Sequence, residues 1–335
     1  MISLKTNKIK ALAAGLMLTL ALGALGCGGD KKEAGKKIEK ANVGIVQLVE
    51  HEALDAANKG FVDGLASKGY KEGQNITFDR QNAQADQSNL QNIAHRFVNN
   101  KVDLICAIAT PAAQTIANVT SDIPIVATAV TDYKTAKLVK DDAKPGTNVT
   151  GTTDMNPVAE QLDLLLKLVP NAKTIGTIYC SSEVNSQLQV EILKKAAQAK
   201  GITVKEATVS NVNDIQQAAH SLVGSVQAVY VPTDNVLASA IPTLITVTNE
   251  AKLPVICGEG GMVRAGGLAT LGVDYYKLGF QTGEMAADIL SGKAKPAEMA
   301  IQAQKEFKPV INLKEAAQIG LTVPEELQKS ADVIK

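Results

Sequence analysis

The sequence predicts an α/β protein built from two doubly wound, Rossmann-like lobes. Its 335 residues are enough for two domains, each with a core of its own. From residue 42 onward, short apolar runs alternate with segments in which apolar residues recur at helical spacing, and the alternation restarts near residue 158. Strands that alternate with helices indicate parallel sheets covered by helices on both faces, so two series indicate two such lobes.

The first series supplies five expected strands and three expected helices. Leu54, Ala57 and Phe61 illustrate the helical spacing of apolar residues. Pro111 opens the third helix, where proline is tolerated because the first N–H groups of a helix have no partner within it. The expected strands are 43–48, 76–80, 102–109, 123–130 and 148–153, and the expected helices are 51–68, 87–99 and the segment from 111.

The second series repeats the pattern, and a tail follows it. Its expected strands are 174–179, 203–208, 228–231, 254–257 and 268–271, and its expected helices are 158–168, 186–200, 215–223 and 237–251. In the tail, a helix over 275–290 ends at Gly292 and precedes extended segments at 300–306 and 309–312 and a short helix at 313–319. The tail is too small for a third domain, so we expect it to return across the domain boundary and complete both lobes.

The N-terminal segment is predicted to be a secretion signal. Lys5, Lys8 and Lys10 precede an apolar run over 11–25, which is short for a membrane-spanning helix. The run ends in Ala-Leu-Gly-Cys27, a lipobox-like cleavage site.

We therefore expect residues 1–26 to be a signal peptide and Cys27 to become the lipidated first residue of the mature protein. The Gly- and Lys-rich segment over 27–40 is expected to be a flexible tether. This places the protein on the extracytoplasmic face of the cell membrane. An ordinary signal peptide cleaved near Cys27 and an uncleaved anchor are the alternatives.

Charge and cysteine usage exclude several classes. Lys and Arg together number 34, as do Asp and Glu, so no basic excess points to nucleic acid. Cys106, Cys180 and Cys257 each lie in or beside a different expected strand, at spacings that match no metal site. We expect buried free thiols and no metal.

Polar side chains follow most of the expected strands. In open parallel sheets, ligands bind beyond the carboxyl ends of the strands. The segments at these ends are 49–51, 110–112, 128–132, 181–186, 232–235, 258–261 and 274–275. One polar segment is explained by helix capping, but polar segments from both halves indicate a ligand-binding cleft.

Five segments carry a resemblance to a known family: VGIVQLVEH at 43–51, AIATPAAQ at 107–114, NVTG at 148–151, VPTDN at 231–235 and GVDYY at 272–276. With them the chain resembles the substrate-binding lipoproteins of ABC importers that have the type I periplasmic-binding-protein fold. Within that family it is similar to the tryptophan- and tyrosine-type aromatic amino acid binding proteins.

The resemblance implies two lobes that close on one small molecule like a Venus flytrap. It implies a monomer without catalytic activity or cofactor, which delivers its ligand to an ABC permease with its ATPase. The three crossovers between lobes are expected near 150–155, 273–275 and 301–305, with lobe 1 formed by 41–151 plus 275–302 and lobe 2 by 152–274 plus 303–335.

An amino acid ligand needs a site for its carboxylate, and two helix starts are candidates. One is the start at Thr110, Pro111 and Ala112, where backbone N–H groups favour anions. The other is the segment with Ser182, Asn185 and Ser186, which adds side-chain donors; the alternative there is capping alone.

The ligand's ammonium needs an acceptor. Asp234, next to Asn235, is the first candidate, and its alternative role is to cap the following helix. Asp274 is the second, with hinge hydrogen bonding as its alternative. Weaker candidates are Glu50 and Glu259 for the ammonium, Thr110 and Thr128 as hydroxyl contacts, and His51, Tyr275 and Tyr276 to flank an aromatic side chain.

The sequence gives less support to other functions. A hydrolase would need Ser181 or Ser182 with His51 or His220, but no Gly-x-Ser-x-Gly segment is present. A nucleotide-binding enzyme is disfavoured because neither Gly-x-Gly-x-x-Gly nor a Walker loop follows a strand. A receptor lipoprotein that senses a ligand, and a binding protein for a different small solute, stay open.

Overall fold

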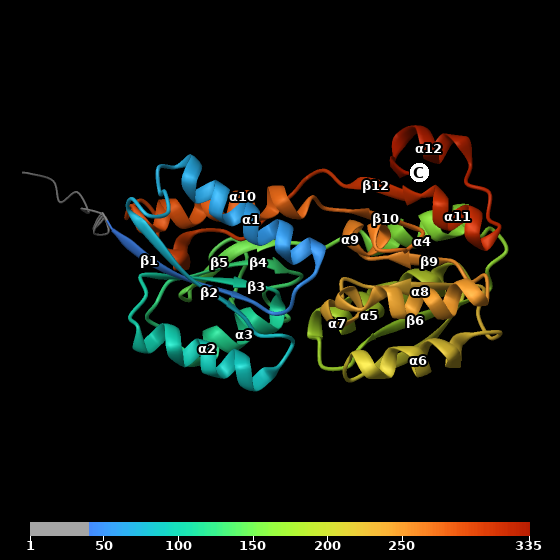
Figure 1. The fold of residues 1–335 in the computed structure, drawn as a ribbon, viewed down its shortest axis with the longest axis horizontal. Helices are drawn as coiled ribbons and strands as arrows, with labels where there is room; N and C mark the ends of the chain where they lie inside the picture. Colours follow the sequence, from blue (N-terminus) through green and yellow to red (C-terminus); the bar gives the residue numbers. More distant parts are fainter. Residues whose placement is uncertain (1–39) are drawn as a thin grey trace, which may run out of the picture. The chain divides into compact units, whose positions relative to one another are not determined.

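Two β-sheets organise residues 40–335, the part of the chain that the computed structural model describes (Figure 1). The first sheet has six parallel strands in the order β11-β5-β4-β3-β1-β2. The second has seven strands in the order β13-β12-β10-β9-β8-β6-β7, with only the β10–β12 pair antiparallel. The predicted fold class of two α/β lobes is confirmed. The expected signal peptide, Cys27 and most of the tether lie outside the described residues.

The first sheet and the helices packed on it are called lobe 1, and the second sheet with its helices lobe 2. The strands are β1 (Ala41–Gln47), β2 (Ile76–Asn82), β3 (Leu104–Ile108), β4 (Ile125–Val130), β5 (Val149–Thr153), β6 (Thr174–Cys180), β7 (Thr203–Val209), β8 (Ala228–Val231), β9 (Val255–Cys257), β10 (Ala269–Gly272), β11 (Gln302–Ala303), β12 (Lys308–Asn312) and β13 (Asp332–Ile334). The helices are α1 (Glu52–Ser67), α2 (Gln87–Asn99), α3 (Thr110–Val119), α4 (Val158–Leu168), α5 (Val184–Ala199), α6 (Ile215–Leu222), α7 (Asn235–Ser239), α8 (Ile241–Glu250), α9 (Gly260–Arg264), α10 (Tyr275–Leu290), α11 (Leu313–Ile319) and α12 (Glu325–Ser330).

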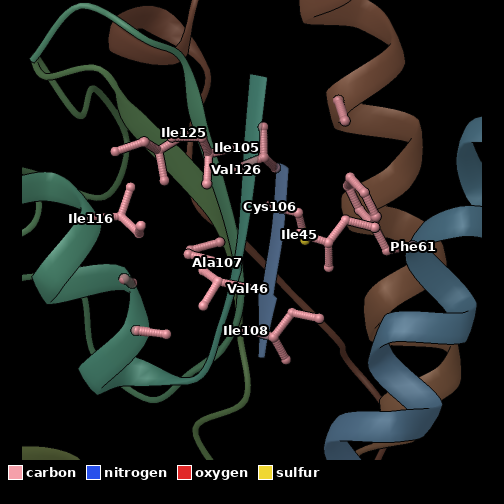
Figure 2. Packing of buried hydrophobic residues seen from close by; sticks show 14 of the residues in the cluster. Ile45, Val46, Phe61, Ile105, Cys106, Ala107, Ile108, Ile116, Ile125 and Val126 are labelled. Atoms are coloured by element: carbon pink, nitrogen blue, oxygen red, sulfur yellow. The ribbon is translucent and has the colours of Figure 1, made fainter. Parts of the chain in front are cut away.

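The first sheet is buried on both faces. Helices α1 and α10 lie on one face, and α2 and α3 lie on the other (Figure 1). Successive residues of a strand point to opposite faces, so Ile45 packs toward Phe61 of α1 while Val46 points toward Ile116 of α3 (Figure 2). Burial on both faces explains why β3 and β4 are continuous apolar runs rather than alternating ones.

The second sheet also separates two apolar cores. Val229 and Tyr230 are neighbours on β8 but belong to different clusters. The Val229 cluster includes residues of α6 and α8, and the Tyr230 cluster includes residues of α4, α5 and α11. Each lobe therefore has the helix–sheet–helix layering of a doubly wound fold.

Glycines bring α1 and α10 unusually close together. A Cβ on Gly279 of α10 would overlap the carbonyl oxygen of Ala57 on α1, and a Cβ on Gly64 of α1 would overlap that of Phe280 on α10. This close packing fixes α10, which follows the second lobe's β10 in the chain, against the first lobe.

The chain passes between the two sheets three times. It leaves β5 for α4, returns from β10 to α10, and leaves β11 for β12. Thr150 of β5 anchors the segment between α10 and β11, which precedes the last passage, since its hydroxyl donates to the carbonyl of Met299 at 2.7 Å. The lobe boundaries expected at 151 and 302 lie near these passages and stay a prediction.

Three expected elements differ in the structure. The single helix expected over 237–251 is divided into α7 and α8, because Pro242 in the first turn of α8 cannot continue a preceding helix. Helix α5 begins at Val184, so the polar segment after β6 is mostly helical and not a long turn. Within the polar segment 258–261, where no helix was expected, the short helix α9 begins, and Glu259 caps it.

The three cysteines of the described region, Cys106, Cys180 and Cys257, are buried and form no disulfide. Within residues 40–335, no helix is long and apolar enough to cross a membrane.

Candidate ligand-binding site

A cavity lies where the carboxyl ends of strands from both lobes meet. Its volume is about 10 Å³, which is room for about one water molecule. An amino acid can therefore enter only if the surrounding groups move apart. The lining residues are His51, Leu54, Ala129, Thr131, Asp154, Asn185, Thr233, Asp234, Asn235, Ala238, Glu259, Met262 and Tyr275.

A bulge in β4 shapes the first lobe's side of the cavity. The pairing of β4 with β5 shifts between Ala127 and Val130, and Ala129 within this shift has a φ of 55°. Positive φ is uncommon for residues other than glycine, and bulges of this kind occur beside functional sites. Here the bulge places the small Ala129 in the wall of the cavity.

The charged part of the lining is acidic. Asp154, Asp234 and Glu259 are all buried and line the cavity, whereas no Lys or Arg is among the described residues that do so. Buried carboxylates are costly unless they are paired or hydrogen-bonded. The cavity is therefore suited to a ligand group that is positively charged and rich in N–H donors.

Asp154 links two of the passages between the lobes. It follows β5, and it accepts hydrogen bonds from the Tyr275 hydroxyl at 2.6 Å and the Thr131 hydroxyl at 3.0 Å. Burial raises the pKa of Asp154, and these two bonds oppose the rise. Sequence reasoning missed Asp154, although an aspartate at the carboxyl end of a strand was a usable signal.

Asp234 caps α7 and lines the cavity at the same time. It accepts hydrogen bonds from the backbone N–H of Leu237 at 2.9 Å and of Cys180 at 2.7 Å, and from the Ser186 hydroxyl at 2.7 Å. Burial raises its pKa. The capping role and the ligand role, which the sequence presented as alternatives, are compatible in one side chain.

Glu259 is the corresponding group at α9. Its carboxylate accepts from the backbone N–H groups of Gly261 and Met262. Burial raises the pKa of Glu259 to about 7, and these N–H bonds oppose the rise. A small change in surroundings therefore changes its charge near neutral pH.

Glu183 does not line the cavity but contacts residues that do, and it was not among the candidates predicted from the sequence. It is buried, and it accepts hydrogen bonds from the backbone N–H groups of Asn235 and Val236 and from the side-chain amides of Asn185 and Asn235. Burial and the neighbouring Asp234 raise the pKa of Glu183 to about 8. It was overlooked within the polar segment 180–187 because its partners on α7 are about fifty residues away in the chain.

His51 and Asn235 connect the lobes across the cavity. His51 Nε2 lies 3.3 Å from Asn235 Oδ1. Burial lowers the pKa of His51 to about 4, so the ring is neutral at neutral pH. The buried atoms His51 Nδ1 and Asn185 Oδ1 have no hydrogen-bond partner within residues 40–335, and both residues line the cavity.

The other candidates of the first lobe lie outside the lining. Glu50 is exposed. Thr110, Pro111 and Ala112 form the first turn of α3, where the buried Thr110 hydroxyl has no partner. Thr128 is buried in β4, and its hydroxyl lies 3.1 Å from that of Thr152.

Most of the remaining candidates, from lobe 2 and from α10, also lie outside the cavity lining. Ser182 is exposed, and its hydroxyl lies 3.2 Å from Cys180 Sγ. Ser186 does not line the cavity, but its hydroxyl donates a hydrogen bond to Asp234, which does. Asp274 caps α10 by accepting from Lys277 N–H at 3.1 Å. Asp274 and Tyr276 line an adjoining pocket at the lobe junction, while Tyr275 lines the cavity itself.

The chain is similar to several known proteins. Residues 42–335 match the family model described as ABC transporter substrate binding protein. A tyrosine-binding protein of Clostridioides difficile (strain R20291) is 49% identical over 265 residues, which cover 79% of this chain and 76% of that protein. An ABC domain from Streptococcus pneumonia, solved in complex with L-Trp, is 42% identical with a TM-score of 0.85, covering 88% of this chain and 100% of that one.

Two further solved structures allow a comparison of the conformation and of the fold. The ligand-free, open structure of a substrate binding protein with adhesive properties from Clostridium difficile is 44% identical but has a TM-score of only 0.68, over 88% of this chain and 99% of that one. A solute binding protein from Bacillus halodurans with bound myo-inositol shares the fold at 16% identity, with a TM-score of 0.60 over 89% of this chain and 98% of that one. This chain therefore resembles the L-Trp complex more closely than the open structure.

Proposed function

Because this chain belongs to the family of ABC transporter substrate binding proteins, we propose that it captures an aromatic L-amino acid (Trp, Tyr or Phe) and delivers it to an ABC permease. The observation that carries this proposal is the cavity, which offers buried carboxyl groups and unpartnered acceptors but no lining Lys or Arg within residues 40–335. An ammonium group has three N–H donors and a positive charge, which match these features.

We propose that the three N–H groups of the ammonium donate to Asp154, His51 Nδ1 and Asn185 Oδ1, while the carboxyl groups of Asp234 and Glu259 add negative charge around it. Tyr275, Leu54 and Met262 supply aromatic and apolar surface for the side chain. The start of α3 at Thr110 remains our candidate for the ligand's carboxylate, supported by its unpartnered hydroxyl and the free N–H groups of a helix start.

Capture by lobe closure is supported by the narrow cavity and by the similarity to the L-Trp complex. The permease and its ATPase would hydrolyse ATP and carry out transport. Lipidation of Cys27 would hold the protein at the membrane and near the permease. A different small solute, or a ligand-sensing receptor role, is the alternative.

The first test is native mass spectrometry of residues 28–335, followed by calorimetry of the stripped protein against the twenty amino acids. We expect an aromatic amino acid to bind, and Asp154→Asn to weaken its affinity by about tenfold or more, because a charge-assisted hydrogen bond is lost. Asp122→Asn removes an exposed carboxylate outside the cavity and should leave affinity unchanged. Stripped protein that ignores all twenty amino acids would contradict the proposed ligand class.

A further inference from the structure

We propose that Glu183, a residue that does not line the cavity, determines which ligand groups the cavity accepts, by fixing the amides of Asn185 and Asn235 and, through Asn235, the tautomer of His51. The inference rests on the proposed function in one respect: the ligand group that the cavity selects is a hydrogen-bond donor such as an ammonium. Glu183 is a positioning residue in this scheme, because it acts only through its neighbours.

In its ionised form Glu183 can only accept hydrogen bonds, and its neighbours are all donors. Oε1 accepts from Asn235 N at 3.0 Å and Val236 N at 3.1 Å, and Oε2 accepts from the side-chain amides of Asn185 at 2.9 Å and Asn235 at 2.6 Å. Two of these donors are backbone N–H groups, whose direction cannot be reversed. The carboxylate therefore requires each of the two side-chain amides to point its nitrogen inward.

The Asn235 amide carries this constraint across to the other lobe. Since its Nδ2 faces Glu183, its Oδ1 faces His51 Nε2 at 3.3 Å. An amide oxygen has no hydrogen to donate, so His51 must carry its proton on Nε2. In a neutral imidazole the other nitrogen, Nδ1, is then an acceptor.

The Asn185 amide is fixed in the same way. Its Nδ2 donates to Glu183 and to the carbonyl of Thr233 at 3.0 Å, which leaves Oδ1 without a partner. The two unpartnered atoms on cavity-lining residues, His51 Nδ1 and Asn185 Oδ1, are therefore both acceptors because of one buried carboxylate. A ligand that presents donors satisfies both, and a ligand that presents acceptors leaves both unpaired.

The test reads the tautomer of His51 in stripped protein by ¹⁵N NMR of histidine side chains. The chain has three histidines, and His95 and His220 are exposed, so single substitutions of these two assign the spectrum. The spectra and the affinities are recorded at least one pH unit above the pKa of Glu183, which burial and Asp234 raise to about 8, so that most Glu183 is ionised. We expect the Nε2–H tautomer in the unmodified protein, and finding Nδ1–H there would overturn the inference without any variant.

The variant Glu183→Gln places a donor where only an acceptor stood. The Asn235 amide can then reverse, its Nδ2 can donate to His51, and the ring should change to the Nδ1–H tautomer. We expect affinity for an aromatic amino acid to fall about tenfold. Glu315→Gln, which alters another buried carboxyl group of lobe 2 away from the cavity, should change neither the tautomer nor the affinity.

The results for Glu183→Gln also test the inference. An unchanged tautomer in a folded Glu183→Gln protein overturns the inference, and so does a changed tautomer with unchanged affinity. If this variant does not fold, the tautomer of the unmodified protein remains the deciding measurement. Because the tautomer is read without ligand, the expected NMR result together with failure to bind any amino acid would refute the proposed function and leave the Glu183 relay in place.

Discussion

At the residue scale, buried carboxyl groups dominate the site, and each is held by neutral donors rather than by a cation. Asp154, Glu183, Asp234 and Glu259 accept hydrogen bonds from hydroxyl, amide and backbone N–H groups, and none has a Lys or Arg partner within 40–335. Burial raises all four pKa values. A positively charged ligand group beside these carboxyl groups would stabilise their ionised form. The affinity should therefore depend on the charge of the ligand.

The Tyr275 hydroxyl is expected to stabilise both the lobe junction and the site. Tyr275→Phe removes the 2.6 Å hydrogen bond to Asp154 and leaves a buried carboxyl group with one donor fewer. We expect the free energy of unfolding to fall by about 1.5–3 kcal/mol, measured by urea denaturation. Tyr230→Phe is the matched control: its 2.7 Å bond goes to the neutral side chain of Gln161, so its loss should cost about 1 kcal/mol. Equal losses in the two variants would contradict a special role for Asp154.

Glu259 should make stability depend on pH in the direction opposite to that of an ordinary salt-bridged acid. Its pKa is about 7 in the folded protein and 4.5 in ordinary surroundings, so between these values the folded state retains a proton that the unfolded state has lost. Its contribution to stability is therefore present below pH 4.5 and is lost as pH rises to about 7. Urea denaturation at a series of pH values should show this decline, and Glu259→Gln should make it smaller, leaving the part that Glu183 contributes with its pKa of about 8. A decline of the same size in the variant would assign it to other groups.

The sequence indicated the polar lining only in part. Asp234, Asn235, Asn185, Glu259 and His51 follow expected strands directly, and the structure brings them together. The roles of these residues in ligand binding stay predictions. Asp154 was missed although its place at the carboxyl end of an expected strand was visible in the sequence. Glu183 was missed because what distinguishes it is its partner Asn235, which is 52 residues away in the chain. No local pattern reports such contacts.

At the element scale, the seam between α1 and α10 depends on residues without side chains. Gly279→Ala would place a Cβ against the Ala57 carbonyl and force the helices apart. We expect a loss of about 1–3 kcal/mol in the free energy of unfolding, measured by urea denaturation. In an open helix the same change stabilises by about 1 kcal/mol. Unchanged or increased stability would therefore mean that the two helices are not tightly packed.

Element boundaries were predictable where local chemistry decides them. The expected helix over 275–290 matches α10, whose start Asp274 caps and which Gly292 follows. The undivided helix expected over 237–251 was wrong, although Pro242 was visible in the sequence. The position of α10 against α1 was not predictable from periodicity, because an apolar stripe shows that a helix packs but not on what.

At the scale of the whole molecule, two pairs join the lobes beside the cavity: His51 with Asn235, and Glu52 with Arg264. The two-lobe architecture was predictable from the repeated alternation of strands and helices. The contacts between residues of the two lobes were not predictable. They depend on the angle between the lobes, and the contacts inside each lobe do not determine that angle.

The ion pair of Glu52 with Arg264 should act as a latch on the closed state. Both side chains are partly exposed, so the pair is screened by solvent and we expect only a few-fold effect. Arg264→Glu places two carboxylates face to face and should speed ligand release at low salt, with the difference shrinking as salt is added. The double variant Glu52→Arg/Arg264→Glu should restore slow release. Lys200→Glu, which breaks the ion pair with Asp163 inside lobe 2, is the matched control and should leave release unchanged.

The chain offers a clean readout for this latch because it contains no tryptophan. The fluorescence of bound L-Trp can therefore be followed in a stopped-flow instrument without a background from protein tryptophan. Faster release in Arg264→Glu that the double variant reverses would show that the pair opposes opening of the lobes. Faster release that the double variant does not reverse would mean that Arg264 acts instead through the nearby Glu259, which lines the cavity. That result would move the control of release from the lobe junction to the binding site itself.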